Sequence, residues 1–194
     1  MYGVSIAATY HHGDLRTALV TAALTLLEAG EGPPSLREVA RAAGVSAMAP
    51  YRHFADRAAL LAAVADEGFG ALRTWLLAAD DVPDSRTALV AQGRAYVDFA
   101  LAHPALFRLM FSREKAGGVP EGETAYTVLA NRVAQIAPDR AEPATLAAWG
   151  LVHGLATLLL DANVGALHRG AVEATLDLLV DGMMARGSSK GSTG

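Results

Sequence analysis

The sequence predicts an all-α protein of about nine helices, and three observations support this fold class. Apolar residues recur at three- and four-residue intervals along most of the chain. No stretch shows the alternating, β-branched pattern of a strand. The breaks between the periodic runs, such as "AGEGPP" and "APDRAEP", are rich in Gly and Pro. Since hydrophobic residues make up 52% of the 194 residues, the chain can bury a substantial core in one or two small domains.

The first two predicted helices are short and lie before residue 45. The first follows Asp14, a good N-cap residue, and ends at "AGEGPP". Its apolar face consists of Leu15, Ala18, Leu19, Ala22, Ala23, Leu26 and Leu27. The second begins with a capping box formed by Ser35 and Glu38, and Gly44 is placed to terminate it.

A third short helix is predicted to follow the turn "GVS". Ser46 is the N-cap in this interpretation, and the helix extends to about Phe54. Pro50 then occupies the fourth helical position, where its missing N–H deletes only the hydrogen bond back to Ser46. The proline is therefore compatible with a helix that is very short.

The remainder of the chain is predicted to form one long helix and a bundle. The long helix starts at Asp56 or Arg57 and ends near "ADDVPDS". Five further helical runs follow: 85–102, 104–111, 123–137, 144–163 and 171–186. We therefore expect an N-terminal arm and three-helix module in residues 1–57, a long helix leading into a bundle in 58–186, and a disordered low-complexity tail in 187–194.

Charge is distributed unevenly along the chain. The formal net charge is −4, which by itself disfavours a nucleic-acid partner. Residues 35–57, however, contain four arginines and only two acidic residues, whereas the chain after residue 60 has 11 basic and 15 acidic residues. A modestly positive N-terminal module joined to an acidic remainder fits DNA binding by the first part only.

Several classes of site and location are disfavoured by composition. The chain has no cysteine, which excludes disulfides and thiolate sites and fits a reducing, cytoplasmic compartment. No N-terminal segment has the pattern of a signal peptide. The run "WGLVHGLATLLL" is too short to span a membrane and contains His153. His11 and His12 have no cysteine or carboxylate at ligand spacing, so neither a metal site nor a cofactor is predicted.

The segment from Ser35 to Phe54 has the pattern of a helix-turn-helix motif, with a short capped helix, a turn with Gly and a second short helix. The second helix of such a motif enters the major groove of DNA. Ala47 and Ala49 are small enough to permit close approach, and Pro50 offers a flat apolar surface to a thymine methyl group. Arg52 can form a bidentate pair with guanine, and Tyr51 can donate to a phosphate.

At these residues the chain resembles the TetR family of transcriptional regulators. The resemblance covers about residues 10–70 and rests on "YHHGDLRTALVTAALTLLEAG" and "SLREVARAAGVSAMAPYRHFADRAALL". It implies a homodimer that binds a palindromic DNA operator and whose C-terminal domain senses a small molecule. By position in the motif, the expected DNA contacts are Ser35, Arg37, Ser46, Ala47, Met48, Ala49, Pro50, Tyr51, Arg52, His53 and Arg57. His53 fits a phosphate contact and a structural hydrogen bond equally, whereas Phe54 is expected in the core.

The C-terminal segments "HPALFRLMF" and "WGLVHG" resemble a TetR subgroup whose C-terminal domain carries a W-x-x-x-H-G motif. The bulky residues of this domain are the candidates for contacts with an apolar effector: Trp75, Tyr96, Phe99, Phe107, Met110, Phe111, Trp149 and His153. Core packing accounts for each of them as well. A sensor pocket is mostly apolar with a few polar groups, and Tyr96 with His153 fits that role.

The helix around Trp149 is apolar around most of its circumference, so it must bury two faces. The last helix offers a matching apolar stripe. The candidate dimer contacts on the two helices are Leu151, Leu155, Leu158, Val172, Leu176, Leu179, Val180 and Met183. Spacing alone explains the stripe equally well by core packing, and the family resemblance favours a four-helix dimer interface.

Three classes of function account for these features to different degrees. A ligand-responsive, DNA-binding repressor fits the motif and the resemblance. An all-helical hydrolase or metal-dependent enzyme would need a phosphate loop, a G-x-S-x-G elbow or a clustered carboxylate pair, and the sequence has none of these, so no enzymatic activity is expected. A DNA-binding structural protein without a sensor would have a C-terminal domain that lacks an internal cavity.

Overall fold

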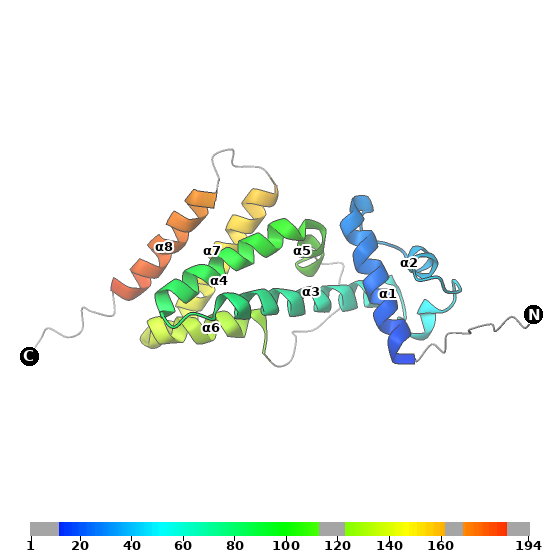
Figure 1. The fold of residues 1–194 in the computed structure, drawn as a ribbon, viewed down its shortest axis with the longest axis horizontal. Coiled ribbons are helices and arrows are strands. Elements are labelled where there is room, and N and C mark those ends of the chain that lie inside the picture. Colours follow the sequence, from blue (N-terminus) through cyan, green and yellow to red (C-terminus); the bar gives the residue numbers. More distant parts are fainter. Residues whose placement is uncertain (1–11, 113–122, 162–168, 186–194) are drawn as a thin grey trace, which may run out of the picture. The chain divides into compact units, whose positions relative to one another are not determined.

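The computed structural model describes residues 12–112, 123–161 and 169–185. These parts contain eight α-helices and no strand, which confirms the all-α prediction and comes close to the expected nine helices. The helices are α1 (His12–Leu26), α2 (Leu36–Ala42), α3 (Arg57–Ala79), α4 (Ser85–Ala102), α5 (Pro104–Met110), α6 (Ala125–Ile136), α7 (Ala141–Leu160) and α8 (Arg169–Ala185) (Figure 1). The predicted arm and the predicted tail 187–194 lie outside the described residues, apart from the start of α1.

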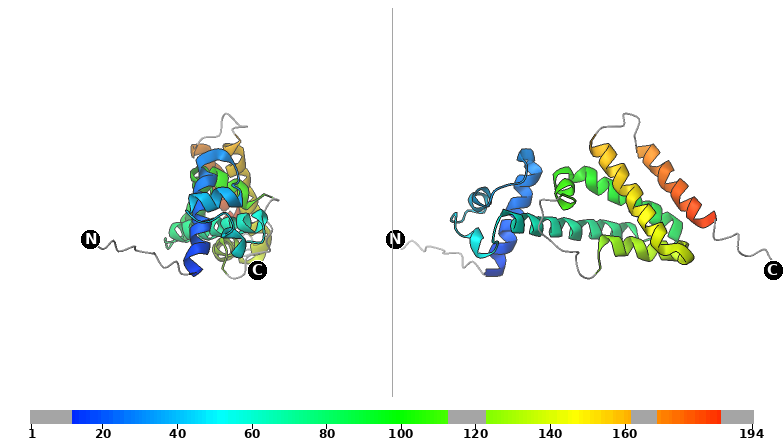
Figure 2. Two further views of the ribbon diagram at one scale, coloured as in Figure 1. Left: turned by 90° about the vertical axis from the view of Figure 1, so that its right-hand side faces the viewer. Right: turned by 180° about the vertical axis from the view of Figure 1, so that it is seen from behind.

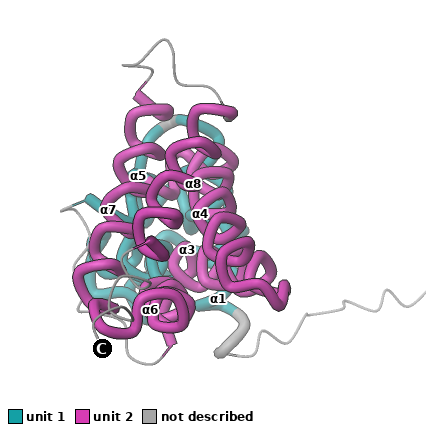
Figure 3. The backbone as a smooth tube through the Cα atoms, turned by 90° about the vertical axis from the view of Figure 1, so that its left-hand side faces the viewer, with its two compact units in different colours: residues 1–66, 108–118 teal, residues 67–107, 119–194 magenta. Residues whose placement is uncertain are grey.

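The described residues divide into two compact units (Figure 3). The first unit comprises residues 12–66 with 108–112, and the second comprises 67–107, 123–161 and 169–185. The first unit thus extends past the boundary expected at residue 57 and includes the start of α3. Both α3 and α5 contribute residues to each unit.

The core of the first unit forms where α1 packs against α2. Its buried residues include Leu19, Ala23, Leu27, Leu36, Val39, Phe54, Leu60 and Val64. Phe54 is 3% exposed, which confirms its predicted place in the core. The guanidinium of Arg16 lies 5.4 Å from the centroid of the Phe54 ring, so a cation–π contact adds to this packing.

Helix α2 has well-defined ends, as the sequence predicted. The Ser35 hydroxyl accepts the N–H of Glu38 at 3.3 Å, and the Glu38 carboxylate accepts the N–H of Ser35 at 2.7 Å. At the other end, Val45 N–H donates to the Ala40 carbonyl and Gly44 N–H donates to the Arg41 carbonyl, the pattern of a Schellman motif. Gly44 has a φ of 68°, a left-handed conformation that favours glycine.

The predicted third α-helix, from Ser46 to about Phe54, is wrong in its form. The chain makes a turn at Ser46–Ala49, followed by a single 3₁₀ turn at Pro50–Arg52. Because Pro50 has no N–H, the Ser46 carbonyl accepts the N–H of Ala49 instead, at 2.9 Å. This i→i+3 bond tightens the segment, and Arg52 N–H continues the same pattern by donating to the Ala49 carbonyl.

Helix α4 lies at the centre of the second unit and packs against α6, α7 and α8. Helices α7 and α8 also contact each other, and they lie side by side in Figure 1 and in the right-hand view of Figure 2. The core of the bundle draws buried side chains from four helices, among them Leu89, Val133, Ala148 and Val180.

Helix α8 is held close to α4 by a glycine and three ion pairs. A Cβ atom added at Gly93 would lie 2.6 Å from Cδ2 of Leu176, so this leucine packs directly on the backbone of α4. Arg86 donates to both Asp177 and Asp181 at 2.9 Å, and Arg94 forms the third ion pair, with Glu173 at 3.2 Å. These contacts fix the register of α8 on α4.

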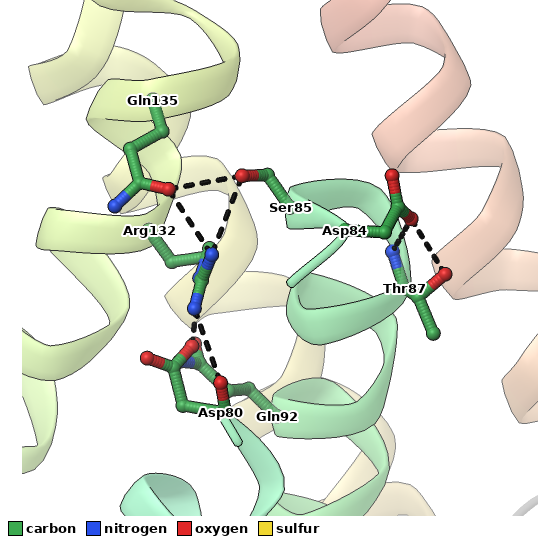
Figure 4. A network of polar contacts seen from close by, with 7 residues as sticks. All are labelled: Asp80, Asp84, Ser85, Thr87, Gln92, Arg132 and Gln135. Atoms are coloured by element: carbon green, nitrogen blue, oxygen red, sulfur yellow. Dashed lines mark hydrogen bonds and ion pairs between the residues drawn. The ribbon is translucent and has the colours of Figure 1, made fainter. Parts of the chain in front are cut away.

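A network of polar side chains joins the end of α3 to α4 and α6 (Figure 4). Arg132 donates from Nε to the carboxylate of Asp80 at 2.7 Å and from Nη2 to the Asp80 carbonyl at 3.1 Å. Its Nη1 donates to Ser85 and Gln135. Gln92, which is 1% exposed, donates to the same Asp80 carboxylate at 2.6 Å. The hydrogen bond to Asp80 raises the pKa of Arg132, so this buried guanidinium stays charged.

Most of the predicted dimer stripe belongs to the core of this chain. Leu155, Val172, Leu176, Val180 and Met183 are all less than 9% exposed within the single chain, because both helices pack on α4. Assigning these five to a partner interface was therefore wrong. Leu151 and Leu179 are half-buried, and Leu158 is 39% exposed.

The apolar character of α7 is also explained by packing within the chain. The segment 138–160 is long and apolar enough to cross a membrane by length and composition. It contacts α4, α6 and α8 as a central helix of the bundle, with Ala148, Val152 and Ala156 buried. Its hydropathy is explained by this packing.

Candidate nucleic-acid interface

The first unit has an open recess between the start of α2 and the segment that leads into α3. Its volume is about 390 Å³. It is lined by Ser35, Leu36, Arg37, Tyr51, Ala55, Asp56 and Arg57. We refer to it as the α2 recess. Four of the eleven predicted DNA contacts line it, although they come from two segments about 15 residues apart in the sequence.

Three side chains that line or flank the α2 recess are donors without an acceptor in the described part of the chain. Arg37, Tyr51 and Arg52 are exposed, and no described residue accepts a hydrogen bond from any of them. Tyr51 is 47% exposed. Two guanidinium groups and a phenol available to solvent suit an anionic partner, because phosphate oxygens accept hydrogen bonds from all three.

Arg57 differs from Arg37, Tyr51 and Arg52 because its side chain already donates hydrogen bonds within the chain. Nη2 donates to the carbonyl of Pro33 at 2.7 Å, and Nε donates to the carbonyl of Pro34 at 3.2 Å. These bonds tie the first turn of α3 to the loop before α2, whereas the sequence indicated only a positive charge at this position. Since Arg57 also lines the α2 recess, it contributes positive charge there while it holds the loop.

Two carboxylates beside the recess are occupied by backbone donors. Asp56 accepts the N–H of Ala59 at 2.8 Å, which caps α3. Hydrogen bonding to Ser35 lowers the pKa of Glu38, so this capping carboxylate stays ionised at neutral pH. Both acids therefore serve the ends of helices.

The turn Ser46–Ala49 presents small and apolar side chains. Ser46, Ala47 and Met48 are exposed, and Met48 is 69% exposed. Ala49 and His53 are half-buried. Pro50 is buried, so its predicted contact with a thymine methyl group is wrong: the ring packs inside the unit because the tight 3₁₀ turn directs it there.

In the second unit, aromatic residues predicted as effector contacts pack on one another. Tyr96 lies edge-on to Phe107 at 5.8 Å and to Trp149 at 5.2 Å between ring centroids. The Tyr96 hydroxyl is 3.0 Å from Nδ1 of His153. Burial raises the pKa of Tyr96 and lowers that of His153, so both are neutral near pH 7.

The other predicted effector contacts are placed differently. Phe99 is fully buried and packs on Trp75 at 5.7 Å, while Trp75 itself is 37% exposed. Met110 and Phe111 belong to the first unit, and Phe111 is 36% exposed. The structure thus brings Tyr96, Phe107, Trp149 and His153 together.

Sequence reasoning missed the polar groups buried beside this cluster. Gln92 lies one helical turn before Tyr96 on α4, and its Oε1 atom is buried without a hydrogen-bond donor in the described part of the chain. A recess of about 50 Å³ lies elsewhere, lined by Arg94, Val97, Asp98, Leu101, Leu159, Val172 and Glu173. The sequence signal that could have indicated the buried Gln92 is a Gln among the apolar residues of this helix. No group of three or more metal-binding side chains occurs among the described residues, and the His11-His12 pair falls outside the side chains described.

The all-helical fold, the capped α2 and the α2 recess define a DNA-binding module of the helix-turn-helix type attached to a helical bundle. Two family models match the chain. Bacterial regulatory proteins of the tetR family match residues 19–64, and the tetracyclin repressor-like C-terminal domain matches residues 89–183. The chain belongs to the tetR family of bacterial regulatory proteins. The subgroup with the W-x-x-x-H-G motif remains a prediction.

Solved structures agree with this assignment. A protein of unknown function from Rhodococcus sp. RHA1 is 35% identical, with a TM-score of 0.73 over 92% of this chain and 98% of that chain. The Q116A variant of TetR from Acinetobacter baumannii AYE, solved with minocycline, is 21% identical, with a TM-score of 0.62 over 95% and 100%. A TetR regulator from Streptomyces coelicolor is 20% identical, with a TM-score of 0.67 over 88% and 97%. The last two share the fold. No curated protein sequence matches the chain.

Proposed function

We propose that this protein is a cytoplasmic transcriptional repressor that binds a palindromic operator as a homodimer and is released by an apolar small molecule. The observation that carries the proposal is the set of unused donors, Arg37, Tyr51 and Arg52, at the α2 recess and the adjoining turn. Such donors position a protein on the phosphate backbone and read base edges. The proposed role is binding, and no catalytic role is proposed.

Homodimerisation is supported by apolar faces that α7 and α8 leave exposed. On α7, Leu146, Gly150, Gly154 and Leu158 follow one another at four-residue spacing, with Leu146 65% exposed. On α8, Leu178 is 75% exposed. A Cβ atom at Gly150 or Gly154 would meet nothing within 4 Å, so these glycines are not required by packing inside the chain. They permit close approach of a second helix pair, and such a four-helix interface replaces the buried stripe predicted from the sequence.

The effector site is proposed at the cluster of Tyr96, Phe107, Trp149 and His153. It combines apolar rings with two neutral polar groups, a composition typical of small-molecule sites. A relative with the same fold was solved with minocycline, which supports a ligand-binding role for the bundle. Helices α3 and α5 contribute residues to both units and are the candidate carriers of a signal between them.

DNA binding is tested by incubating the purified protein with a random pool of duplexes and sequencing the retained fraction. We expect enrichment of a palindrome whose half-sites lie about 10–10.5 base pairs apart, centre to centre, or at a multiple of this spacing. The variant Arg37→Ala/Arg52→Ala serves as the matched control and should enrich nothing. Retention of all duplexes alike by both proteins would contradict operator binding.

The dimer is tested by replacing Gly150 with Trp, since the site is exposed and the monomer fold tolerates a side chain there. We expect light scattering to show a dimer for the wild type and a monomer for this variant, with unchanged helical content by circular dichroism. Gly70, another exposed helical glycine without neighbours within 4 Å, supplies the control variant Gly70→Trp. A monomeric wild type would overturn the proposal.

A further inference from the structure

Met48 is the most exposed large apolar side chain of the first unit, at 69%. It occupies a central position of the turn Ser46–Ala49, which is closed by the hydrogen bond from Ala49 N–H to the Ser46 carbonyl. Its neighbour Ala47 is also exposed. The tip of the turn therefore presents an apolar surface, with Ser46 as its only hydrogen-bonding side chain.

The turn that carries Met48 is fixed at both ends. Before it, the Schellman bonds of Gly44 and Val45 define where the chain leaves α2. After it, buried Pro50 and buried Phe54 anchor the 3₁₀ turn in the core. Met48 is thus presented at a defined position while it stays 69% exposed.

The surroundings of Met48 indicate what kind of partner covers it. Arg52, four residues away, and the α2 recess with Arg37 and Tyr51 supply cationic and phenolic donors that no described residue uses. Charge complementarity therefore favours an anionic partner over an apolar protein surface. On DNA, the one apolar group that base edges present in the major groove is the C5-methyl group of thymine.

We propose that Met48 reads the C5-methyl group of a pyrimidine in the operator. The inference rests on the proposed DNA-binding function and assigns to Met48 the contact that buried Pro50 cannot make. The flexible, polarizable thioether suits contact with a single methyl group. Because 5-methylcytosine carries the same methyl group at the same ring position, the protein should respond to this base as it does to thymine.

The test uses the duplex most strongly enriched by the protein from a random pool. Each thymine of one half-site is replaced singly by uracil, which removes the methyl group and leaves Watson–Crick pairing unchanged. We expect one position per half-site at which uracil weakens binding by the wild type about fourfold, the ratio for one buried methyl group at about 0.8 kcal/mol. Replacing thymine there by cytosine and by 5-methylcytosine gives a second pair that differs only in the methyl group, and the methylated duplex should bind about fourfold better.

Met48→Ala is the variant that assigns this effect to the side chain, and its exposure makes a folding defect easy to exclude by circular dichroism. At the identified position, Met48→Ala should bind the thymine and uracil duplexes equally. Met48→Leu, which keeps the apolar volume, should retain the preference. A uracil penalty that persists in Met48→Ala, or a wild type indifferent to uracil at every thymine, would overturn the inference while leaving DNA binding intact. Failure to enrich any duplex would instead contradict the proposed function.

Discussion

Arginine side chains in the two compact units have different surroundings. In the second unit, Arg73, Arg86, Arg94 and Arg132 all form ion pairs with carboxylates on other segments of the bundle. In the first unit, Arg37, Arg41 and Arg52 have no carboxylate within ion-pair distance among the described residues. The first unit therefore keeps its positive charge available for a partner, whereas the second uses its charges to hold helices together.

The arginines of the two units also differ in how far their side chains are exposed to water. The paired arginine most protected from water is Arg132, with 11% of its side chain exposed. A buried pair is costly to break, because the remaining partner keeps its charge without compensation. An exposed, unpaired arginine can be removed at little cost to folding. Loss of a buried, paired arginine should therefore lower stability, whereas loss of an exposed, unpaired arginine should leave stability nearly unchanged.

The largest effect is expected for Arg132→Met. This change removes the hydrogen bonds to Asp80, Ser85 and Gln135 and leaves a half-buried carboxylate with only Gln92. We expect the free energy of unfolding, measured by urea denaturation, to fall by about 2–4 kcal/mol. Arg37→Met is the matched control and should change stability by less than about 0.5 kcal/mol. Equal losses in both variants would remove the distinction between the units.

Arg52→Ala should have the opposite profile. We expect unchanged stability and a loss of about 1–3 kcal/mol of discrimination at one base-pair position per half-site, because a base-reading arginine is removed. Sequencing of duplexes selected by wild type and variant measures this loss. If the selected sequences are the same, Arg52 contacts the backbone and does not read a base.

Arg37 and Arg57 both line the α2 recess, but only Arg57 forms hydrogen bonds that should also contribute to stability. Arg37→Ala should reduce the slope of log affinity against log salt concentration by about 1 and leave stability unchanged. Arg57→Ala should reduce the slope similarly, because its charge is also at the recess, and lose about 1 kcal/mol of stability with the bonds to Pro33 and Pro34. A stability loss with an unchanged salt slope would make Arg57 a purely structural residue.

The smallest effect is expected at His153. Its pKa is lowered in the folded protein by burial, so unfolding is accompanied by proton uptake just below the ordinary value of about 6.5. The contribution of neutral His153 is fully present above about pH 6.5 and is lost as the pH falls below it. We expect thermal unfolding to show a smaller loss of stability between about pH 7 and pH 5.5 in His153→Gln than in the wild type. A steeper loss in the variant would mean that the shift has the wrong sign.

Local chemistry in the sequence was sufficient to predict much of the first unit. The capping box of Ser35 and Glu38, the termination at Gly44 and the core position of Phe54 depend on residues close in sequence or on a strong apolar signal, and all three are confirmed. The predicted run 85–102 also matches α4, which the structure shows to be capped by Asp84 and to end at His103.

Features that depend on distant segments were decided only by the tertiary structure. Whether the α7 and α8 residues such as Leu155 and Val180 face the core or a partner depends on where α4 packs, which helical spacing cannot specify. Pro50 was placed on the DNA side because its sequence position fits the motif, yet the tight 3₁₀ turn buries it. The Arg132 network joins residues about 50 positions apart, beyond the reach of any local pattern. The sequence by itself thus determined where most of the helices lie and how α2 and α4 begin and end, because these depend on neighbouring residues. Packing decided the form of the Ser46–Phe54 segment and which face of each helix is available for function.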